Sequence, residues 1–547
     1  MLVQTARSQR AGFEGTELVT HTFRMLALGC SALALAACGA DDIASPGTGG
    51  NITINNPPAP TPTPTPPPTG GDLVTPAGAC PTIAGGSLTN GGTISGPTGE
   101  YRVCTLPARF TASTTLPYFR GVLYQMDGRV DVGSDGGPTP DASDGLSDTN
   151  VTLTIEPGVI VFASGASFLN VNRGNRINAV GTVARPIVFT SRDNVAGLNN
   201  ESSSGQWGGV VLSGRAPVTD CIAPAAAPGT VNCERQVEGA AQPALFGGAT
   251  PADSSGTLRY VQIRYSGFVL SGNSELQSLT TGGTGSGTQI DFIQSYNSSD
   301  DAVEFFGGIV NAKRLVLVGA EDDMLDTDTG VRANLQYVIA VQRQGAGDTM
   351  IEADSTNTLI DSLPRQYTVV SNATFIQNST AGDGGSVIRI RGGTDYALLN
   401  SVVVSRAGVT CLRLDDAQTI RAADASLEER GPPVFQSVAL DCGTAVFRNG
   451  SNGPTAANAQ AIFEAGSNNR SAFTNTLTMT YINGANEAGV TAFNPTSISS
   501  FFDNVNYIGA VRDANDTWYQ GWTCNSATAS FGTSNTGRCD RLPVYPA

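Results

Sequence analysis

The chain has 547 residues with 65 Gly and 30 Pro, and only 14% of its residues are charged. A surface with so few charges must consist largely of small polar residues, which is typical of an extracellular β-rich protein. The formal net charge of -16 repels phosphate groups and anionic lipid headgroups, so it excludes nucleic acid as the main partner.

The only histidine, His21, precedes the end of the export signal described next. We therefore expect the exported protein to contain no histidine. This excludes histidine zinc sites, Ser-His-Asp and Cys-His catalysis, and imidazole acid-base relays. Any chemistry would have to come from carboxylates, arginine, tyrosine or an oxygen-ligated metal.

Residues 1–37 are predicted to be an export signal with an over-extended start, because Met25 could open a signal of ordinary length. Their apolar core is too short to span a bilayer. The segment Leu35-Ala36-Ala37-Cys38 resembles the lipobox of bacterial lipoproteins. The resemblance implies lipidation of Cys38 and, with Gly39 next, anchoring in the outer membrane at the cell surface. An ordinary signal followed by a chance cysteine is the alternative.

Residues 38–78 are predicted to be a tether between the anchor and the folded part of the chain. The Pro/Thr-rich run at residues 57–68 favours polyproline II, which at about 3.1 Å per residue spans roughly 37 Å. We expect this spacer to hold the folded part away from the lipid, so the membrane is a partner only through the anchor.

Eight cysteines remain when Cys30 and Cys38 are set aside. An even number in an exported chain indicates disulfides formed in an oxidising compartment. Short loop closure favours pairs that are neighbours in sequence. We therefore predict Cys80 with Cys104, Cys221 with Cys233, Cys411 with Cys442, and Cys524 with Cys539. None of them lies in a CxxC cluster, so we predict no zinc site.

Between residues 151 and 440, short β-branched runs recur every twenty to thirty-odd residues, separated by Gly, Asn, Asp and Ser. Repeats of this length, each too small to bury its apolar face alone, predict a solenoid. A β-propeller would need four strands and an aromatic signature in each repeat, which are missing. The predicted fold class is therefore all-β, a right-handed parallel β-helix.

Several motifs in this region resemble a family of bacterial surface β-helix lipoproteins with a pectate-lyase-like solenoid. The resemblance covers roughly residues 151–354 and implies the fold and a cell-surface location, but no catalytic motif. The motifs are Leu153-Thr154-Ile155-Glu156-Pro157-Gly158, Ile177-Asn178-Ala179-Val180-Gly181-Thr182, Arg185-Pro186-Ile187-Val188-Phe189-Thr190-Ser191, Trp207-Gly208-Gly209-Val210 and Asp300-Asp301-Ala302-Val303-Glu304-Phe305-Phe306-Gly307-Gly308.

The flanking segments are predicted to close the solenoid ends, since an open coil exposes a strand edge. We expect an N-terminal cap at residues 79–150, the β-helix at 151–510, and a disulfide-stapled C-terminal cap at 511–547. In that last segment, Trp518 and Trp522 are expected to pack in the interior, and stacking on sugar is the alternative.

Aligning successive coils places charged residues in two outward columns of one face, because alternate positions of each run are apolar. The first column is Glu304, Asp326, Glu352, Arg389 and Arg413. The second column is Phe306, Asp328, Asp354, Arg391 and Asp415. The long interval between Glu352 and Arg389 makes that step the weakest part of the alignment.

Asp326, Asp328, Glu352 and Asp354 should form a compact square, since neighbouring coils lie about 4.8 Å apart. Their mutual repulsion requires a proton, an arginine or a cation nearby. Calcium, which accepts six to eight oxygens, is the candidate cofactor. The alternative, which we weight above calcium, is that Arg389, Arg391 and Arg413 neutralise the carboxylates or that these are solvated charges on a surface strand. Preceding turns add negative charge through Asp300, Asp301, Asp322, Asp323 and Asp348.

The leading functional hypothesis is a surface binding or scaffold lipoprotein whose partner is a polysaccharide or an outer-membrane receptor, while an adhesin differs only in its partner. The alternative is an enzyme acting on polyuronates. It would be a calcium-dependent lyase with Arg389 or Arg391 as base, or a hydrolase with Asp326 and Asp328 as acid and base. The absent histidine excludes a polygalacturonase site. The glycine-rich segment 282–287 lacks a following helix and a lysine, so no nucleotide is expected.

Overall fold

A computed structural model describes residues 73–545, apart from residues 142, 239, 241, 271–274, 356–359, 381–384 and 444. The predicted signal, the lipidation site Cys38 and nearly all of the tether lie outside the described residues. The described residues belong to one compact unit, residues 68–547. No described helix is both long and apolar enough to cross a membrane.

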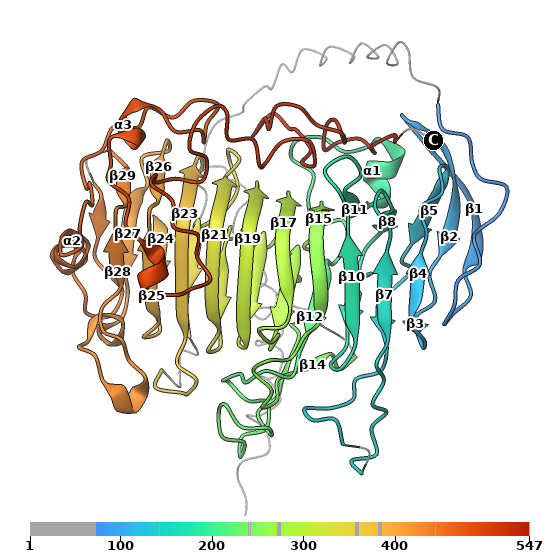
Figure 1. Cartoon of the computed structure of the whole chain (residues 1–547), viewed down its shortest axis with the longest axis horizontal. Coiled ribbons are helices and arrows are strands. Elements are labelled where there is room, and N and C mark those ends of the chain that lie inside the picture. The colour runs from blue at the N-terminus through green and yellow to red at the C-terminus, as the bar shows by residue number, and fades with distance from the viewer. Residues whose placement is uncertain are drawn as a thin grey trace, which may run out of the picture. The chain divides into compact units, whose positions relative to one another are not determined.

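The described chain folds as a parallel β-helix, so the predicted fold class is confirmed (Figure 1). Each coil contributes strands to three faces. The first face carries β4 (Thr114–Leu116), β7 (Thr152–Ile155), β10 (Arg176–Val180), β25 (Asp395–Leu399) and β28 (Val434–Gln436). The second face carries β2 (Gly99–Thr105), β5 (Val122–Gln125), β8 (Ile160–Ala163), β11 (Ile187–Ser191), β26 (Val402–Ser405) and β29 (Ala439–Asp441).

In the middle of the solenoid, single long strands continue from the first face onto the second. They are β15 (Gly256–Arg264), β17 (Gln289–Tyr296), β19 (Ile309–Val318), β21 (Arg332–Val341) and β23 (Tyr367–Gln377). The third face is an eleven-stranded sheet. It consists of β3 (Arg109–Phe110), β6 (Val130–Val132), β9 (Leu169–Val171), β12 (Val210–Ser213), β16 (Leu279–Gly282), β18 (Val303–Phe306), β20 (Asp326–Asp328), β22 (Ile351–Ala353), β24 (Ser386–Ile390), β27 (Thr410–Leu414) and β30 (Phe447–Arg448).

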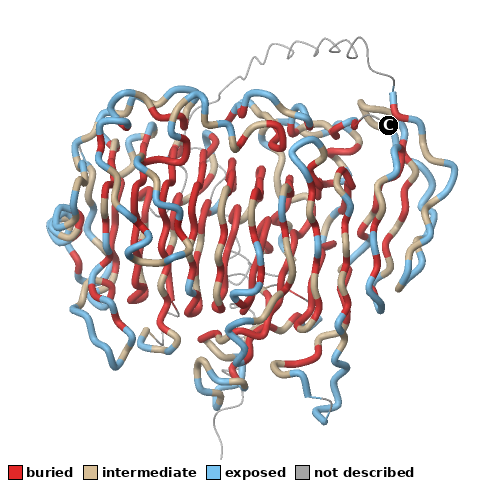
Figure 2. Tube along the Cα trace, viewed as in Figure 1, coloured by how far each residue is buried: buried red, intermediate tan, exposed pale blue. Residues whose placement is uncertain are grey.

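The core is a column of stacked apolar side chains inside the coils. Figure 2 shows the buried residues running along the strands of successive coils. On the second face, Val261, Ile293, Leu315, Val338 and Ala373 are inward-facing and fully buried. The register brings neighbours of this kind directly opposite each other. A buried Leu or Ile contributes about 1.5–3 kcal/mol relative to an exposed one, so each coil is stabilised mainly by the coils on either side.

Each long strand bends where one residue adopts left-handed backbone angles. The φ values are 52° at Tyr260, 55° at Phe292, 58° at Arg314, 63° at Tyr337 and 55° at Asn372. This region normally favours Gly or Asn. Here the bend directs large side chains outward, where they stack on one another, as in the Tyr260 and Phe292 rings with centroids 4.2 Å apart.

The parallel ladder begins earlier than predicted. The antiparallel partner of β2 is β1 (Thr89–Gly96), which closes the N-terminal end. However, β2 and β3 already pair in parallel with β5 and β6. Coils therefore form within the segment 79–150 that we expected to be only a cap, because its short strands bury apolar residues in the same core as those of later coils.

The C-terminal end also differs from the prediction. The last ladder pairs involve β29 and β30, and the helix α2 (Ala456–Glu464) covers the final coil. Its Phe463 ring lies 5.4 Å from Phe435 and 5.7 Å from Phe447. The residues that close this end are therefore not 511–547, because an amphipathic helix with a capping box at Thr455 supplies the cover.

Residues 465–545, which we call the strap, return along the solenoid from the last coils to the first (Figure 1). Amide side chains of successive coils hold the strap backbone. The Gln294 carboxamide donates to the backbone carbonyl of Cys524 and accepts from its backbone N–H. The Gln336 carboxamide binds the backbone of Asp503 in the same two ways. Asn372 donates to the carbonyl of Tyr507 at 2.8 Å. The strap includes α3 (Ala485–Ala488) and a short 3-10 turn (Pro495–Ser497).

Trp522, a residue of the strap itself, is fully buried. Its ring packs edge-on against Tyr260 and Phe292, and Trp518 packs beside the same cluster. The strap ends near the first coils, where the Tyr545 hydroxyl donates to the carbonyl of Pro186 at 2.9 Å. Interior packing of Trp522 agrees with the leading expectation, and Trp518 is partly buried against the same cluster.

All four predicted disulfides are present. Their partners are separated by 12 to 31 residues, so each one staples a local loop. Four small elements complete the described structure. They are α1 (Arg192–Ala196), 3-10 turns at Ala417–Ile420 and Ala425–Leu427, and the antiparallel pair β13 (Arg235–Gln236) and β14 (Leu245–Phe246).

Candidate functional site

The predicted charged column exists on the third face. Glu304 lies opposite Asp326, and Asp326 lies opposite Glu352. Glu352 lies opposite Arg389, and Arg389 opposite Arg413. The register is therefore confirmed, including the long step between Glu352 and Arg389. The inward neighbours of the column residues are mostly apolar, with Thr327 on β20 as the polar exception, which is why the alternation could be aligned.

Arginines occupy the C-terminal half of this ladder. Arg391 forms ion pairs with Glu352 at 2.7 Å and with Asp354 at 3.2 Å. Arg389 joins Glu352 at 3.1 Å to Asp415 at 2.9 Å. Two corners of the predicted carboxylate square are thus neutralised by arginine, as the alternative interpretation expected.

Asp326 and Asp328 are the other two corners, and no described arginine forms an ion pair with them. Burial raises the pKa of both carboxyls, with repulsion from Glu352 as the next cause for Asp326. Burial also raises the pKa of Asp354 to about 7, although Arg391 opposes that shift. In the predicted square, Glu352 and Asp354 are therefore paired with arginine, whereas Asp326 and Asp328 have no described arginine partner.

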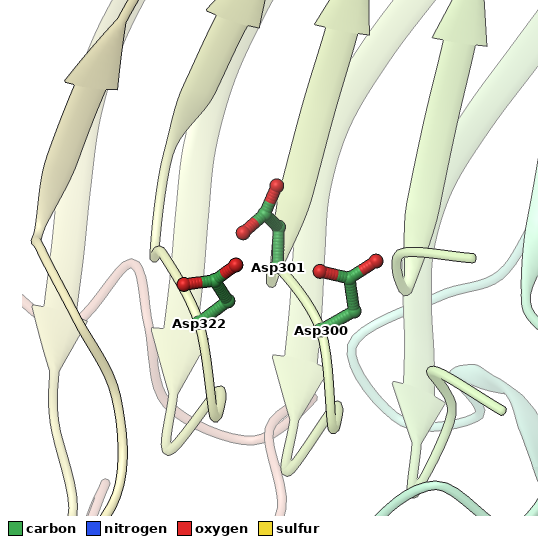
Figure 3. Close-up of side chains that lie close together, drawn as sticks. All are labelled: Asp300, Asp301 and Asp322. Carbon is green, nitrogen blue, oxygen red and sulfur yellow. The ribbon is translucent and has the colours of Figure 1, made fainter. Parts of the chain in front are cut away.

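The densest group of carboxylates lies one turn upstream, which we call the acidic turn cluster. Figure 3 shows Asp300, Asp301 and Asp322 close together on the turns that precede β18 and β20. The full cluster consists of Asp300, Asp301, Glu304, Asp322, Asp323, Asp326 and Asp348. Within it, three sets of three carboxylates each have oxygens within 4.8 Å of one another: Asp300, Asp301 and Asp322; Asp301, Glu304 and Asp326; and Asp322, Asp323 and Asp348.

The cluster has an inner row that organises the turns. The Asp301 carboxylate accepts from the backbone N–H of Asp323 at 2.8 Å. The Asp323 carboxylate accepts from the backbone N–H of Thr349 at 2.6 Å and from its hydroxyl at 2.8 Å. Each buried aspartate thus fixes the turn of the next coil. These two residues have a structural role that the sequence alignment did not reveal.

The outer row consists of Asp300, Asp322 and Asp348. These residues immediately precede Asp301, Asp323 and Thr349 in the sequence. Asp322 is exposed, and the other two are half-buried. Asp300 accepts from the Gln277 carboxamide at 3.2 Å. Among the described residues, neither Asp300 nor Asp322 forms an ion pair with arginine. The outer row therefore places carboxylate oxygens where an ion from solvent can reach them.

Crowding raises the pKa of these acids. Burial, followed by repulsion from Asp322, raises the pKa of Asp300 to about 7. Crowding by protein atoms and repulsion from Asp348 raise the pKa of Asp322 to about 6, although this residue keeps contact with solvent. Burial and mutual repulsion raise the pKa of Asp301, Glu304, Asp323 and Asp326 well above the ordinary range. At neutral pH the cluster must retain protons or hold a cation.

A disulfide-stapled segment between β12 and β15 forms one border of this face. Cys221 is bonded to Cys233, and the β13–β14 hairpin follows. The Arg235 guanidinium carbon lies 5.7 Å from the centroid of the Phe306 ring, next to the ladder. Sequence reasoning missed this border. The unusually long interval between two ladder strands, with its own cysteine pair, was the available signal.

The arrangement limits the chemistry. All ligands in the acidic turn cluster are carboxylate oxygens, which suit a hard cation such as calcium and not zinc or copper. Carboxylates also raise the pKa of Arg391 above its usual range, against the effect of burial. A guanidinium held in this way is a poor proton acceptor, so the geometry disfavours Arg391 as the base of a lyase.

A family model described as a pectate-lyase-like beta helix domain matches residues 145–523. The match covers more than half of the chain and includes the acidic turn cluster and the arginine half of the ladder. No curated protein and no solved structure matches the chain.

Proposed function

The chain belongs to the pectate-lyase-like beta helix family, and from this premise we propose that it is a lipid-anchored surface module that binds an acidic glycan through calcium. The calcium site is assigned to the acidic turn cluster. The observation that carries the proposal is the outer row, in which Asp300 and Asp322 present carboxylates to solvent without a described arginine partner.

Calcium fits the ligands better than other common ions. It accepts six to eight oxygens in flexible geometry, and it tolerates shared carboxylates and water. Asp322 belongs to two of the three carboxylate sets, so it could bridge neighbouring ions along the row. A cation there would also offset the repulsion that raises the pKa of Asp300 and Asp322.

An extended anion suits the face as a whole. The coil spacing of about 4.8 Å places the arginine half of the ladder directly beyond the cluster. Arg389 and Arg391 have side chains that are 20% and 29% exposed. A glycan lying along the solenoid would meet calcium first and guanidinium groups next. The predicted lipid anchor at Cys38 and the proline-rich tether support display at the cell surface, where such glycans occur.

A second candidate is carboxylate-based glycoside hydrolysis. Its support is that the pKa of Asp300 lies near 7 and that of Asp322 near 6. An acid of this strength can donate a proton at neutral pH. The third candidate function is a scaffold that binds an outer-membrane protein, and this function requires no glycan.

The test combines calcium titration with glycan binding by the full-length protein. Calorimetry should detect calcium binding to chelator-treated protein, and Asp300→Asn/Asp322→Asn should abolish it. The matched control is Glu100→Gln/Asp127→Asn, which removes the same charge from exposed positions outside the third face. Soluble polygalacturonate should then be retained only with calcium.

Unchanged calorimetry in the Asp300→Asn/Asp322→Asn variant would overturn the calcium site. Calcium binding without retention of the polymer would favour the protein scaffold. Shortening of the polymer, with new reducing ends, would favour the hydrolase.

A further inference from the structure

A polar pocket of about 590 Å³ lies between the strap and the edge of the second face. We call it the strap pocket. Its walls include Glu201, Arg343, Asn378, Arg406, Thr480 and Thr528. A neighbouring hollow of about 440 Å³ shares Arg343 with it. We propose that the strap pocket binds a small hydroxyl-rich ligand that carries one carboxylate.

The charged side chains that line the strap pocket have ion-pair partners, except Arg406. Arg343 is ion-paired with Glu321. The Glu201 carboxylate contacts Arg538 at 2.9 Å and accepts from the backbone N–H of Ala527 at 3.0 Å. Arg406 is exposed, and its guanidinium forms no ion pair or hydrogen bond with the other described residues. The pocket wall therefore offers one guanidinium to an incoming anion.

A guanidinium recognises a carboxylate through two parallel hydrogen bonds. The protein has a net charge of -16, and both Glu201 and Glu321 lie at the hollows. A ligand with many negative charges would therefore be repelled. A single carboxylate matches the single unpaired arginine.

The other walls offer neutral hydrogen-bonding groups. The Asn378 amide N–H donates to the carbonyl of Gln342 at 2.7 Å, which leaves its own carbonyl oxygen to accept from a ligand. The hydroxyls of Thr480 and Thr528 form no hydrogen bond with described residues, and both line the pocket. Groups of this kind bind the hydroxyls of a polyol. The volume is in the range of small-molecule sites.

The strap residue Thr480, at one wall of the pocket, and the preceding Met479 have strained left-handed backbone angles. Thr480 has a φ of 83° and follows Met479 with a φ of 48°. Left-handed angles are rare for a β-branched residue, and such strain concentrates at binding sites. Two backbone hydrogen bonds between Thr478 and Ile482, at 2.8 and 2.9 Å, maintain the turn. The strain therefore coincides with the wall that would contact the ligand.

The test uses the full-length protein in chelator, so that calcium at the acidic turn cluster does not contribute. Saturation-transfer NMR and calorimetry would compare D-glucuronate with neutral D-glucose. Binding of glucuronate is expected to exceed that of glucose by about tenfold, and Arg406→Gln should remove this difference. The control is Arg192→Gln, which changes another exposed arginine with no described ion pair.

A second variant separates binding from stability. Thr480→Gly should melt at or above the wild-type temperature, because glycine relieves the left-handed strain, and it should bind glucuronate more weakly. Equal binding of glucuronate by Arg406→Gln and wild type would overturn the proposal, as would an absence of saturation transfer. The Asp300→Asn/Asp322→Asn variant should bind glucuronate normally, which keeps this site distinct from the calcium proposal.

Discussion

The guanidinium carbon of Arg314 lies 4.6 Å from the ring centroid of Phe292, the residue at the same bend of the preceding coil. It also lies 5.6 Å from the ring of Tyr337 on the next coil. All three residues share left-handed backbone angles. The bend of this solenoid is thus stabilised by stacked side chains in addition to the backbone ladder.

Replacing Arg314 with alanine should destabilise the middle coils. The change removes two cation–π contacts and the 2.9 Å ion pair with Asp291, whose pKa burial already raises. We expect a loss of about 1–3 kcal/mol in the free energy of unfolding, measured with urea. Arg314→Lys keeps the charge but not the planar group, so it should recover only part of the loss. Full recovery would show that stacking contributes little.

Replacing Trp522 with alanine should loosen the strap. The ring is fully buried against Tyr260 and Phe292, and truncation of such a residue costs about 3–5 kcal/mol. Limited proteolysis should then cut within residues 465–545 before it cuts the coils. Phe119→Ala, at a position that is 51% exposed, serves as control and should change stability by less than about 0.5 kcal/mol. Equal protease resistance of both variants would contradict the role of the strap contact.

Stability without calcium should fall as the pH rises. The folded state raises the pKa of Asp300 to about 7 and that of Asp322 to about 6, from 3.8 when unfolded. The folded protein therefore retains protons that the unfolded chain releases, so this contribution is complete below about pH 4 and is lost through pH 7. Melting in chelator should drop by a few degrees over that interval.

Two comparisons check the origin of this pH effect. Asp300→Asn/Asp322→Asn should flatten the melting curve against pH, because amides do not titrate. Calcium should restore stability at pH 7.5 but not at pH 4, where protons already offset the repulsion. A melting temperature that rises with pH in chelator would be incompatible with the shifts assigned to these two acids.

Replacing Arg391 with methionine should turn the predicted carboxylate square into a cation site. Asp354 would lose its ion pair and Glu352 would keep only the one with Arg389, and we expect a loss of about 1–3 kcal/mol at pH 8. The loss should shrink at pH 5, where Asp354, with a pKa of about 7, binds a proton. Calcium should stabilise this variant more than wild type in thermal melting. Arg448→Met, at an exposed position that continues the neighbouring column beyond Arg413, should show no added calcium effect.

Much of the charged ladder could be predicted, because its outward residues alternate with apolar ones. The pairing of Asp326 with Glu352 follows from aligning Leu325 with Ile351. The inner row could not be found in this way. Asp301 and Asp323 lie in turns, where no alternation indicates which backbone N–H a carboxylate will meet in the next coil.

The strap was mistaken for a cap for a similar reason. Gln294 and Gln336 are ordinary polar residues in the sequence, and their role depends on a segment far along the chain. Disulfides and coil repeats are local features, and they were predicted correctly. Contacts between residues hundreds of positions apart carry no local signal, so the path of residues 465–545 emerged only from the structure.

The return of the strap has a consequence for the order of folding. Leu542 completes the same buried cluster as Val74 and Tyr101, near the other end of the chain. Val74 and Tyr101 are synthesised long before Leu542. The buried cluster on the first coils therefore cannot form until Leu542 has been synthesised. Contacts of such long range slow folding. Without Leu542, apolar surface on the first coils would stay exposed, so this cluster closes only after the end of the strap has packed against those coils.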